Sequence, residues 1–214
     1  MIVHWRKEIL IFASLLLGAN VGFFWLLNGG AYAKEIRYRF FLSTLASDDL
    51  RGELLSLAEK RDLSLPLGSE FQIFIPKIFV AAPIVSPQND SAGSILASLE
   101  AGVGLYPGSV IPGKSGRTVL LGHSSRATWY RGGYATIFTL LDKLETGDKF
   151  FVTEKNKKYH YEVFAKYILT PLETNKLLGR PASGSEIDLL TCYPIGSSSQ
   201  RTVVQAKLIK VEEL

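Results

Sequence analysis

Residues 9–27 carry no charged side chain, and this run divides the chain into parts that meet different surroundings. A helix rises 1.5 Å per residue, so this run of 19 residues spans ~29 Å, about the thickness of the hydrocarbon core of a bilayer. Arg6 and Lys7 precede the run, and cationic residues favour the cytoplasmic side of a membrane. The sequence therefore predicts a cytoplasmic tail over 1–8, a transmembrane anchor over 9–27 and export of the remainder.

A cleaved signal peptide is the alternative interpretation of this segment. Ala31-Tyr32-Ala33 fits the small-x-small pattern of a cleavage site, and cleavage there would release a form that begins at Lys34. The apolar run exceeds the ~7–15 residues usual in a signal peptide, which favours an uncleaved anchor. Both interpretations place the rest of the chain outside the cytoplasm.

Residues 28–69 are expected to form a helical linker. Gly29-Gly30 is expected to end the anchor helix, and residues 34–62 have a helical pattern in two pieces. Ser47 or Asp48 can cap the second piece, and one apolar stripe follows: Leu50, Leu54 and Leu57. The linker is expected to pack lightly, as a spacer between the bilayer and a domain that covers 70–214.

From residue 70 onward, short β-rich segments alternate with Gly and Pro. The expected strands are Phe71–Ile75, Phe79–Ala82, Thr118–Leu121, Lys149–Thr153, Tyr159–Leu169, Ile187–Cys192 and Thr202–Val211. Short helices are expected over Ser94–Glu100 and Tyr134–Leu141. Many short strands, few helices and no βαβ rhythm predict a domain dominated by β-structure, a closed or nearly closed antiparallel barrel.

The composition is ordinary for a globular domain and excludes some classes of function. Of the 214 residues, 47% are apolar and 21% are charged, and the net charge is only +4. The one cationic run, Lys155-Asn156-Lys157-Lys158, is interpreted as a solvated hairpin turn, and no nucleic-acid motif is present. An exported domain with one cysteine has no internal disulfide, so its thiol is a candidate reactive group.

That thiol, Cys192, lies at the end of a predicted strand. Residues 187–190 are mostly apolar, and a Tyr-Pro pair leads from the strand into a loop. Most lone cysteines in proteins are small buried hydrophobic groups. Here, however, Arg201 opens another strand nine residues later, which brings a cationic group into the same region.

Among the three histidines, His123 occupies a position comparable to that of Cys192. It follows the apolar strand end Val119-Leu120-Leu121-Gly122 and precedes polar residues. His160 alternates with other polar residues and is expected on the solvent face of its strand, whereas His4 falls in the cytoplasmic tail.

Cys192, His123 and Arg201 together offer a nucleophile, an acid or base and a cationic stabiliser. One cysteine and two exported histidines in unrelated contexts are too few soft ligands for a metal site. Ser124 and Ser125 are not interpreted as hydrolase nucleophiles, because the G-x-S-x-G motif is absent.

Leu189-Leu190-Thr191-Cys192, with Arg201 downstream, resembles the T-L-x-T-C…R signature of sortases, the cysteine transpeptidases of bacterial cell surfaces. Asp188 stands where the signature has Thr. Residues 118–124 resemble the family's histidine strand, and the resemblance runs from about Phe71 to Val211. Two more segments are similar to sortase segments near the first strands and before the histidine strand: Ile75-Pro76-Lys77-Ile78 and Gly104-Leu105-Tyr106-Pro107-Gly108.

The resemblance implies an eight-stranded sortase barrel with Cys192, His123 and Arg201 at one end. Sortases recognise a Leu-Pro-x-Thr-Gly-type sorting signal, cut it after Thr and hold the peptide as a thioester. An amine from peptidoglycan or a pilin then resolves that thioester. In these roles the Cys192 thiolate attacks, the His123 imidazolium protonates the leaving amine, and Arg201 donates to the substrate carbonyl or the oxyanion.

The resemblance is to a sortase without a lid, of class D or E. Pilus-building sortases often carry a lid with Asp-Pro-aromatic in the N-terminal region, and this chain has no Asp-Pro pair. Some relatives bind calcium beside the active-site loop. Glu173 and Glu186 lie in or near that stretch, but two carboxylates fall short of the about 6–8 oxygens that calcium takes, so no cofactor is expected.

Selectivity for the sorting signal is expected to lie in the segment from Thr170 to Ser185, because its Pro and Gly residues break regular structure and binding loops lie on rigid scaffolds. Thr191 is a further candidate for substrate binding. Three leucines either line a pocket for the apolar residue of the signal or pack the segment onto the barrel: Leu172, Leu177 and Leu178.

Two other functions stay open at this stage. One is another cell-wall thiol enzyme, similar to L,D-transpeptidases, whose pattern has Gly before the Cys and Arg within two residues after it. Thr191 and the distant Arg201 disfavour that alternative. The other is a catalytically silent barrel that binds sorting-signal peptides.

Overall fold

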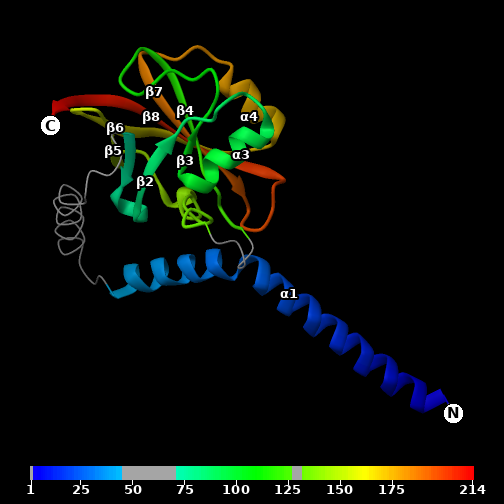
Figure 1. The fold of residues 1–214 in the computed structure, drawn as a ribbon. Helices are drawn as coiled ribbons and strands as arrows, with labels where there is room; N and C mark the ends of the chain where they lie inside the picture. Colours follow the sequence, from blue (N-terminus) through cyan, green and yellow to red (C-terminus); the bar gives the residue numbers. More distant parts are fainter. Residues whose placement is uncertain (1, 45–70, 127–131) are drawn as a thin grey trace.

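The computed structural model describes residues 2–44, 71–126 and 132–214, which form one long helix and a β-barrel (Figure 1). Helix α1 covers Ile2–Thr44. The expected second piece of the linker helix, with its cap at Ser47 or Asp48, lies outside the described residues. So does the expected start of the domain at residue 70.

Eight strands close the barrel in the order β1-β2-β3-β4-β7-β8-β6-β5, which confirms the expected fold class. They are β1 Phe71–Ile75, β2 Val80–Val85, β3 Val103–Leu105, β4 Gly116–Leu121, β5 Lys149–Glu154, β6 Lys157–Leu169, β7 Ser185–Tyr193 and β8 Gln200–Glu213. The intervening helices are η1 Pro76–Ile78, α3 Ala92–Ala101, η2 Leu141–Lys143 and α4 Pro171–Leu178.

Two strand pairings differ from the antiparallel arrangement expected from the sequence. The β2–β3 and β4–β7 pairs are parallel, and the other pairs are antiparallel. Strand β3 was not among the expected strands, because its three residues are too few to show an alternating pattern. The β4–β7 pair matters most for function, because it brings two distant parts of the chain side by side.

The helix expected over residues 134–141 is wrong. Residues 133–140 form successive turns instead, and only the short η2 follows. The N–H of Phe138 donates to the carbonyl of His123 (2.9 Å). An N–H that would bond within a helix thus makes a tertiary contact instead. The hydroxyl of Thr139 likewise donates to the carbonyl of Ser124 (2.6 Å). These bonds hold the turns against the chain that follows β4.

Residues 171–178 form a regular helix, α4, where the sequence predicted an irregular loop. The hydroxyl of Thr170 accepts a bond from the N–H of Glu173 (3.3 Å), and the Glu173 carboxylate accepts one from the N–H of Thr170 (2.9 Å). This capping box starts the helix, and proline is favoured at the first helical position, where Pro171 lies. Pro171 therefore begins a helix rather than breaking one.

Side chains alternate between two apolar clusters along the strands, as strand geometry requires. In β7, Ile187 and Leu189 belong to the main core inside the barrel. Leu190 instead packs with Leu177 of α4 in a second cluster, on the outer face. Cys192, two residues after Leu190, therefore belongs to the outer row.

The cationic run at 155–158 is only partly the solvated turn that was expected. Lys155 and Asn156 form the hairpin turn between β5 and β6. Lys158 is buried, and its Nζ lies 3.7 Å from the centroid of the Phe151 ring. The alternation of β6 turns Lys158 onto this ring, where a cation–π contact compensates for lost water.

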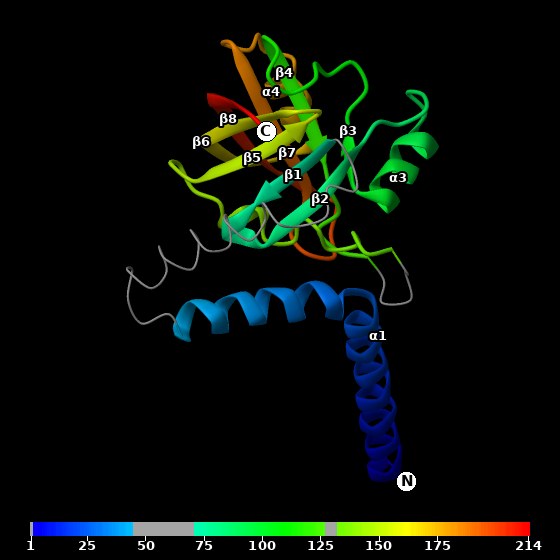
Figure 2. The same ribbon diagram turned by 60° about the vertical axis from the view of Figure 1, so that its left-hand side comes forward.

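Helix α1 has an exposed half and a packed half. Its exposed half includes the uncharged run 9–27, and the segment Glu8–Phe41 is long and apolar enough to cross a membrane. The two halves run in different directions (Figure 2). Gly29 and Gly30 lie where the halves meet, and a glycine pair is a common site for a bend. The expectation that these glycines end the helix is wrong, because the helix continues to Thr44.

The packed half of α1 lies against the barrel more closely than was expected for a spacer that packs lightly. Ala31 and Tyr38 are buried, and Tyr38 belongs to the main core. The Nζ of Lys34 donates to the carbonyls of Thr136 (2.8 Å) and Ile137 (3.3 Å), in the turns described above. Helix α1 is thus fixed to the barrel end that follows β4.

Candidate active site

Strands β7 and β8 and the residues just after β4 bring Cys192, Arg201 and His123 to one end of the outer face. Cys192 and Arg201 are Cα partners in the antiparallel pairing of β7 with β8. Strand β4 runs parallel to β7, and the N–H of Gly122 still donates to the carbonyl of Leu190 (3.0 Å). Because that register continues for one more residue, His123 follows beside Cys192. A thiol, an imidazole and a guanidinium thus share one row.

Contacts inside the barrel end fix the backbone next to this row. The hydroxyl of Thr191 donates to the carbonyl of Gly122 (2.8 Å), so the two strands are joined one residue before Cys192 and His123. A Cβ at Gly122 would lie 2.4 Å from the ring of Phe138, so this close approach requires glycine. Thr191 is buried and acts on the backbone, in addition to any contact with substrate.

Burial of the imidazole lowers the pKa of His123. The Arg126 guanidinium lowers that pKa further, whereas the Glu100 carboxylate opposes the shift. Glu100 and Arg126 also form an ion pair of 3.5 Å. The neutral imidazole is therefore favoured, and the imidazolium is a minor species at neutral pH.

The guanidinium of Arg201 is attached to the loop that joins β7 to β8. Its Nη1 donates to the carbonyls of Ser198 (2.7 Å) and Gln200 (2.8 Å). These two bonds hold the planar group at the partly exposed start of β8, opposite Cys192. A fixed fork of N–H donors at this place is suited to a carbonyl oxygen or an oxyanion.

Cys192 lines two cavities, and both are bordered by α1. The first cavity has a volume of 220 Å³ and is lined by Thr191, Thr202 and the residues after Cys192. Tyr32, Glu35 and Arg39 of α1 complete its lining. The second cavity has a volume of 360 Å³ and is lined by His123, by the β7–β8 loop and by Leu27 and Asn28 of α1. A Cβ at Gly196 would lie 2.6 Å from Oδ1 of Asn28, so helix and loop are in direct contact.

Sequence reasoning missed these helix residues because residues 28–69 were treated as a spacer. A signal was present in the spacing. Asn28, Ala31, Glu35 and Tyr38 recur three, four and three residues apart, which places them on one helix face. That face packs on the barrel, so the long apolar segment and the candidate active site are joined through a single helix.

The three leucines proposed for substrate binding do not border either cavity with Cys192. Leu177 is buried and packs with Leu190 and Val203, one step along the strands from Cys192 and Arg201. Leu178 is partly buried against the same cluster, and Leu172 is exposed. The packing alternative therefore applies to Leu177, whereas Leu178 lies at the edge of an apolar surface beside the row.

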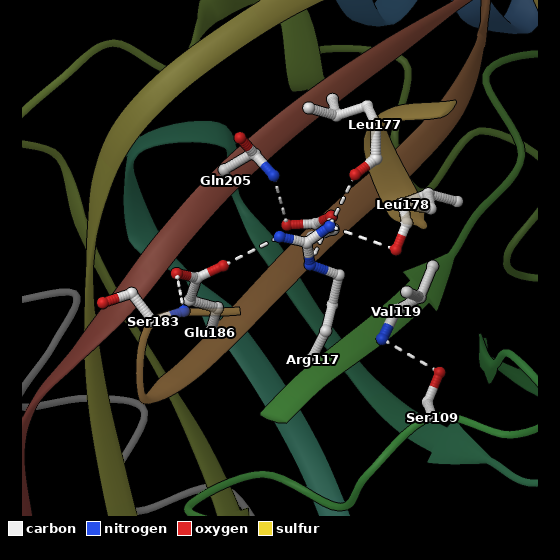
Figure 3. Close-up of polar contacts among 9 residues, drawn as sticks. Ser109, Arg117, Val119, Leu177, Leu178, Ser183, Glu186 and Gln205 are labelled. Carbon is white, nitrogen blue, oxygen red and sulfur yellow. Dashed lines mark hydrogen bonds and ion pairs between the residues drawn. The ribbon is translucent and has the colours of Figure 1, made fainter. Parts of the chain in front are cut away.

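Helix α4 is held on this outer face by a buried arginine. Nη1 of Arg117 donates to the last carbonyls of α4, those of Leu177 (2.7 Å) and Leu178 (3.2 Å) (Figure 3). Its Nη2 donates to Glu186 (3.0 Å), and its Nε lies 3.4 Å from Oδ2 of Asp188. The guanidinium thus joins β4, β7 and the C-terminal end of α4, where a cation is favoured by the helix dipole.

The two carboxylates of this network have further partners. Glu186 accepts a bond from the N–H of Ser183 (2.8 Å), and Gln205 of β8 donates to Asp188 (3.0 Å). Glu186 is engaged by Arg117 and Glu173 caps α4, so both carboxylates that lie in or near the calcium-binding stretch of some relatives have partners within the chain. Among the described residues, no group of three acidic, His or Cys side chains could hold a metal ion.

Burial raises the pKa of Asp188 to about 6, although Arg117 and Gln205 act in the opposite direction. A group whose pKa is higher in the folded state than in the unfolded state stabilises the protein at low pH, and this contribution is lost as the pH rises. For Asp188 the loss falls between about pH 4 and pH 6 and amounts to roughly 3 kcal/mol.

We therefore expect Asp188→Thr, which introduces the residue of the sortase signature, to change how stability depends on pH. Relative to the variant, the wild-type chain should lose roughly 3 kcal/mol of unfolding free energy between pH 4 and pH 7. Urea titrations of the full chain in detergent at several pH values measure this difference. A difference that stays constant over this range would contradict the assignment.

His160 lies far along the barrel from Cys192. In the β6–β8 pairing its partner is Lys210, whereas Arg201 begins β8. Its Nε2 lies 2.8 Å from Oε2 of Glu212, and its side chain is 18% exposed. His160 was expected on the solvent face of its strand, but it is partly buried and contacts Glu212. It does not belong to the row of Cys192, His123 and Arg201.

Comparisons with known proteins agree with this geometry. The model of the family described as Sortase domain matches residues 73–209. Sortase SrtE2 of Streptomyces coelicolor is 32% identical over 92 residues, which are 40% of this chain and 36% of that relative's length. The chain therefore aligns with little more than a third of this curated relative.

Solved structures have the same fold. Pilus-related sortase C of Group B Streptococcus is 29% identical, with a TM-score of 0.54, and the match covers 70% of this chain and 71% of that one. Sortase E1 of Streptomyces coelicolor, solved with a tripeptide in the active site, is 24% identical, with a TM-score of 0.54 over 67% of this chain and 89% of that one. The latter likeness concerns the fold alone.

Proposed function

Since this chain belongs to the sortase family, we propose that it is a membrane-anchored cysteine transpeptidase that cleaves an LPxTG-like sorting signal after Thr and transfers the protein to an amine. The transfer proceeds through a thioester on Cys192. The acceptor amine belongs to peptidoglycan or to a pilin, as the resemblance implies.

The observation that carries this proposal is the row formed by Cys192 of β7, Arg201 of β8 and His123, two residues after the end of β4. The three groups come from positions far apart in the sequence, yet the register of the strands brings them to one barrel end. An L,D-transpeptidase-like enzyme would need its arginine within two residues of the cysteine, whereas here Arg201 comes from the next strand.

Each group has one role in the proposed reaction. The Cys192 thiolate attacks the carbonyl carbon of Thr in the signal, and the tetrahedral oxyanion forms next to the Arg201 donors. The His123 imidazolium gives its proton to the leaving amine as the C–N bond breaks and the thioester remains. Neutral His123 then accepts a proton from the incoming amine, which attacks the thioester and releases the thiolate.

The chemistry requires a thiolate and an imidazolium in the same molecule. With ordinary pKa values of ~8.5 and ~6.5, only about 1% of molecules carry both charges at pH 7. The lowered pKa of His123 makes this fraction smaller still. A slow enzyme with a bell-shaped pH profile follows from this small active population.

The experiment that tests the function is mass spectrometry of the full chain incubated with a library of sorting-signal peptides. We expect an adduct on the Cys192 peptide whose mass equals the signal truncated after Thr, and its release by a small primary amine. Peptide binding without any adduct or cleavage product would favour the silent barrel instead.

The anchor leads to a separate expectation about the mature protein. If residues 9–27 remain as an uncleaved anchor, membrane preparations should contain a chain that retains the N-terminal residues before Ile9. N-terminal peptide mapping of the membrane fraction makes this measurement. Recovery of a soluble form that begins at Lys34 would establish cleavage after Ala33.

A further inference from the structure

The packed half of α1 has an outward face that exposes large apolar side chains. Ile36 and Phe40 are 58% and 70% exposed, on the side of the helix opposite Ala31 and Tyr38. Arg37 is also exposed and lies at the edge of this face, where it borders a cavity together with Lys34, Tyr38 and Phe41. Apolar side chains beside cations, on a helix whose other face is buried, are the pattern of a helix that lies at a membrane surface.

The direction of the helix supports the same interpretation. The two halves of α1 form an angle, and the barrel lies on one side of the second half (Figure 2). If the first half crosses the bilayer, the second half runs along the bilayer surface, between lipid and barrel. The outward face then points toward the lipid headgroups, because the opposite face is occupied by the barrel.

The net positive charge of this half of the helix favours anionic lipids. Residues 29–41 contain three cationic side chains and one acidic side chain, Glu35. Glu35 faces the barrel side, where it pairs with Arg39 (2.8 Å) and Lys143 (3.4 Å). Arg37, at the exposed edge of the outward face, is the cation adjacent to Ile36 in the chain. A juxtamembrane cation of this kind attracts anionic headgroups.

We propose that residues 29–41 form an interfacial helix whose outward face binds a bilayer surface with anionic phospholipids. This holds the candidate active site at the membrane surface, because Tyr32, Glu35 and Arg39 of this helix border one cavity of Cys192, and the preceding Leu27 and Asn28 border the other. The inference rests on the membrane anchor of the proposed function and adds a second, surface-bound segment to it.

The single cysteine makes a direct test practical. In the full chain with Cys192→Ala, new cysteines are introduced one at a time by Leu17→Cys, Ile36→Cys and Lys114→Cys, each at an exposed position. Each is spin-labelled in nanodiscs of equal phosphatidylcholine and phosphatidylglycerol. Power saturation then gives the accessibility of each label to oxygen, which partitions into lipid, and to a water-soluble nickel chelate.

We expect the ratio of oxygen to nickel accessibility to be highest at position 17 and lowest at 114, which lies before β4, at the barrel end away from Cys192. At position 36 the ratio should exceed that at 114 several-fold. Arg37→Gln, or nanodiscs of phosphatidylcholine alone, should lower the ratio at position 36 and leave the ratio at 17 unchanged.

Three outcomes of this experiment would contradict part or all of the proposal. If the label at position 36 is as accessible to nickel as the label at 114 while the label at 17 stays in lipid, the interfacial helix is wrong and the anchor stands. If the label at 17 is also in water, the anchor itself is wrong, and the inference falls with it. If position 36 lies in lipid without any dependence on anionic lipid or Arg37, the choice of partner is wrong.

Discussion

Cys192→Ala is expected to abolish both cleavage of a sorting-signal peptide and the covalent acyl-enzyme, because the chain has no other thiol. Mass spectrometry of the intact protein measures the adduct, and chromatography of the peptide measures cleavage. A variant that still cleaves would require a different nucleophile and would overturn the proposed reaction.

The two partners of Cys192 should fail in different ways. His123→Ala should still be alkylated at Cys192 but should scarcely form the thioester, because the leaving amine lacks a proton donor. Arg201→Lys keeps the charge and loses the fork, so we expect it to lose nearly as much rate as Arg201→Ala, on the order of 10²–10³. His160→Ala is the matched control and should stay near wild type, since His160 pairs with Glu212 elsewhere on the barrel.

Arg117→Leu should be the most destabilising change outside the reactive row. It leaves Glu186 and Asp188 buried without their cation and removes the donor to the last carbonyls of α4. Loss of one partner from a buried charge network typically costs about 3–5 kcal/mol. Urea unfolding of the full chain in detergent, followed by circular dichroism, measures this cost.

Two comparisons make that measurement specific. The exposed Lys149→Leu should change stability by less than about 0.5 kcal/mol. Asp188→Thr should recover part of the stability of Arg117→Leu, because it removes one of the two stranded carboxylates. A cost for Arg117→Leu as small as that for Lys149→Leu would show that the network does not hold α4.

Most of the strands, and the closeness of Cys192 to Arg201, were accessible from the sequence because they depend on local pattern. A short apolar run predicted β7 and a β-rich run predicted β8, and the two strand ends then placed Cys192 close to Arg201. Parallel pairing of β4 with β7 depends instead on a connection of about sixty residues, which no local pattern describes. That pairing is what brings His123 beside Cys192.

Where sequence reasoning was wrong, tertiary contacts or caps decided the local structure. Pro171 was interpreted as a breaker, but the capping box of Thr170 makes it the first residue of α4. Gly29 and Gly30 were interpreted as the end of a helix, but packing of Tyr38 into the core sustains the helix beyond them. In the first case the deciding residues are sequence neighbours of Pro171, whereas in the second the core that holds Tyr38 is built from distant parts of the chain.

The alternation along β7 restricts how the sequence of this strand can vary in length. Inserting one residue between Leu190 and Cys192 would turn the thiol into the barrel interior and bring a core position out to solvent. Inserting two would keep the thiol on its face but move it past Arg201. Relatives that keep this chemistry should therefore accept insertions in the segments before Ser185 and after Tyr193, and none within the strand itself.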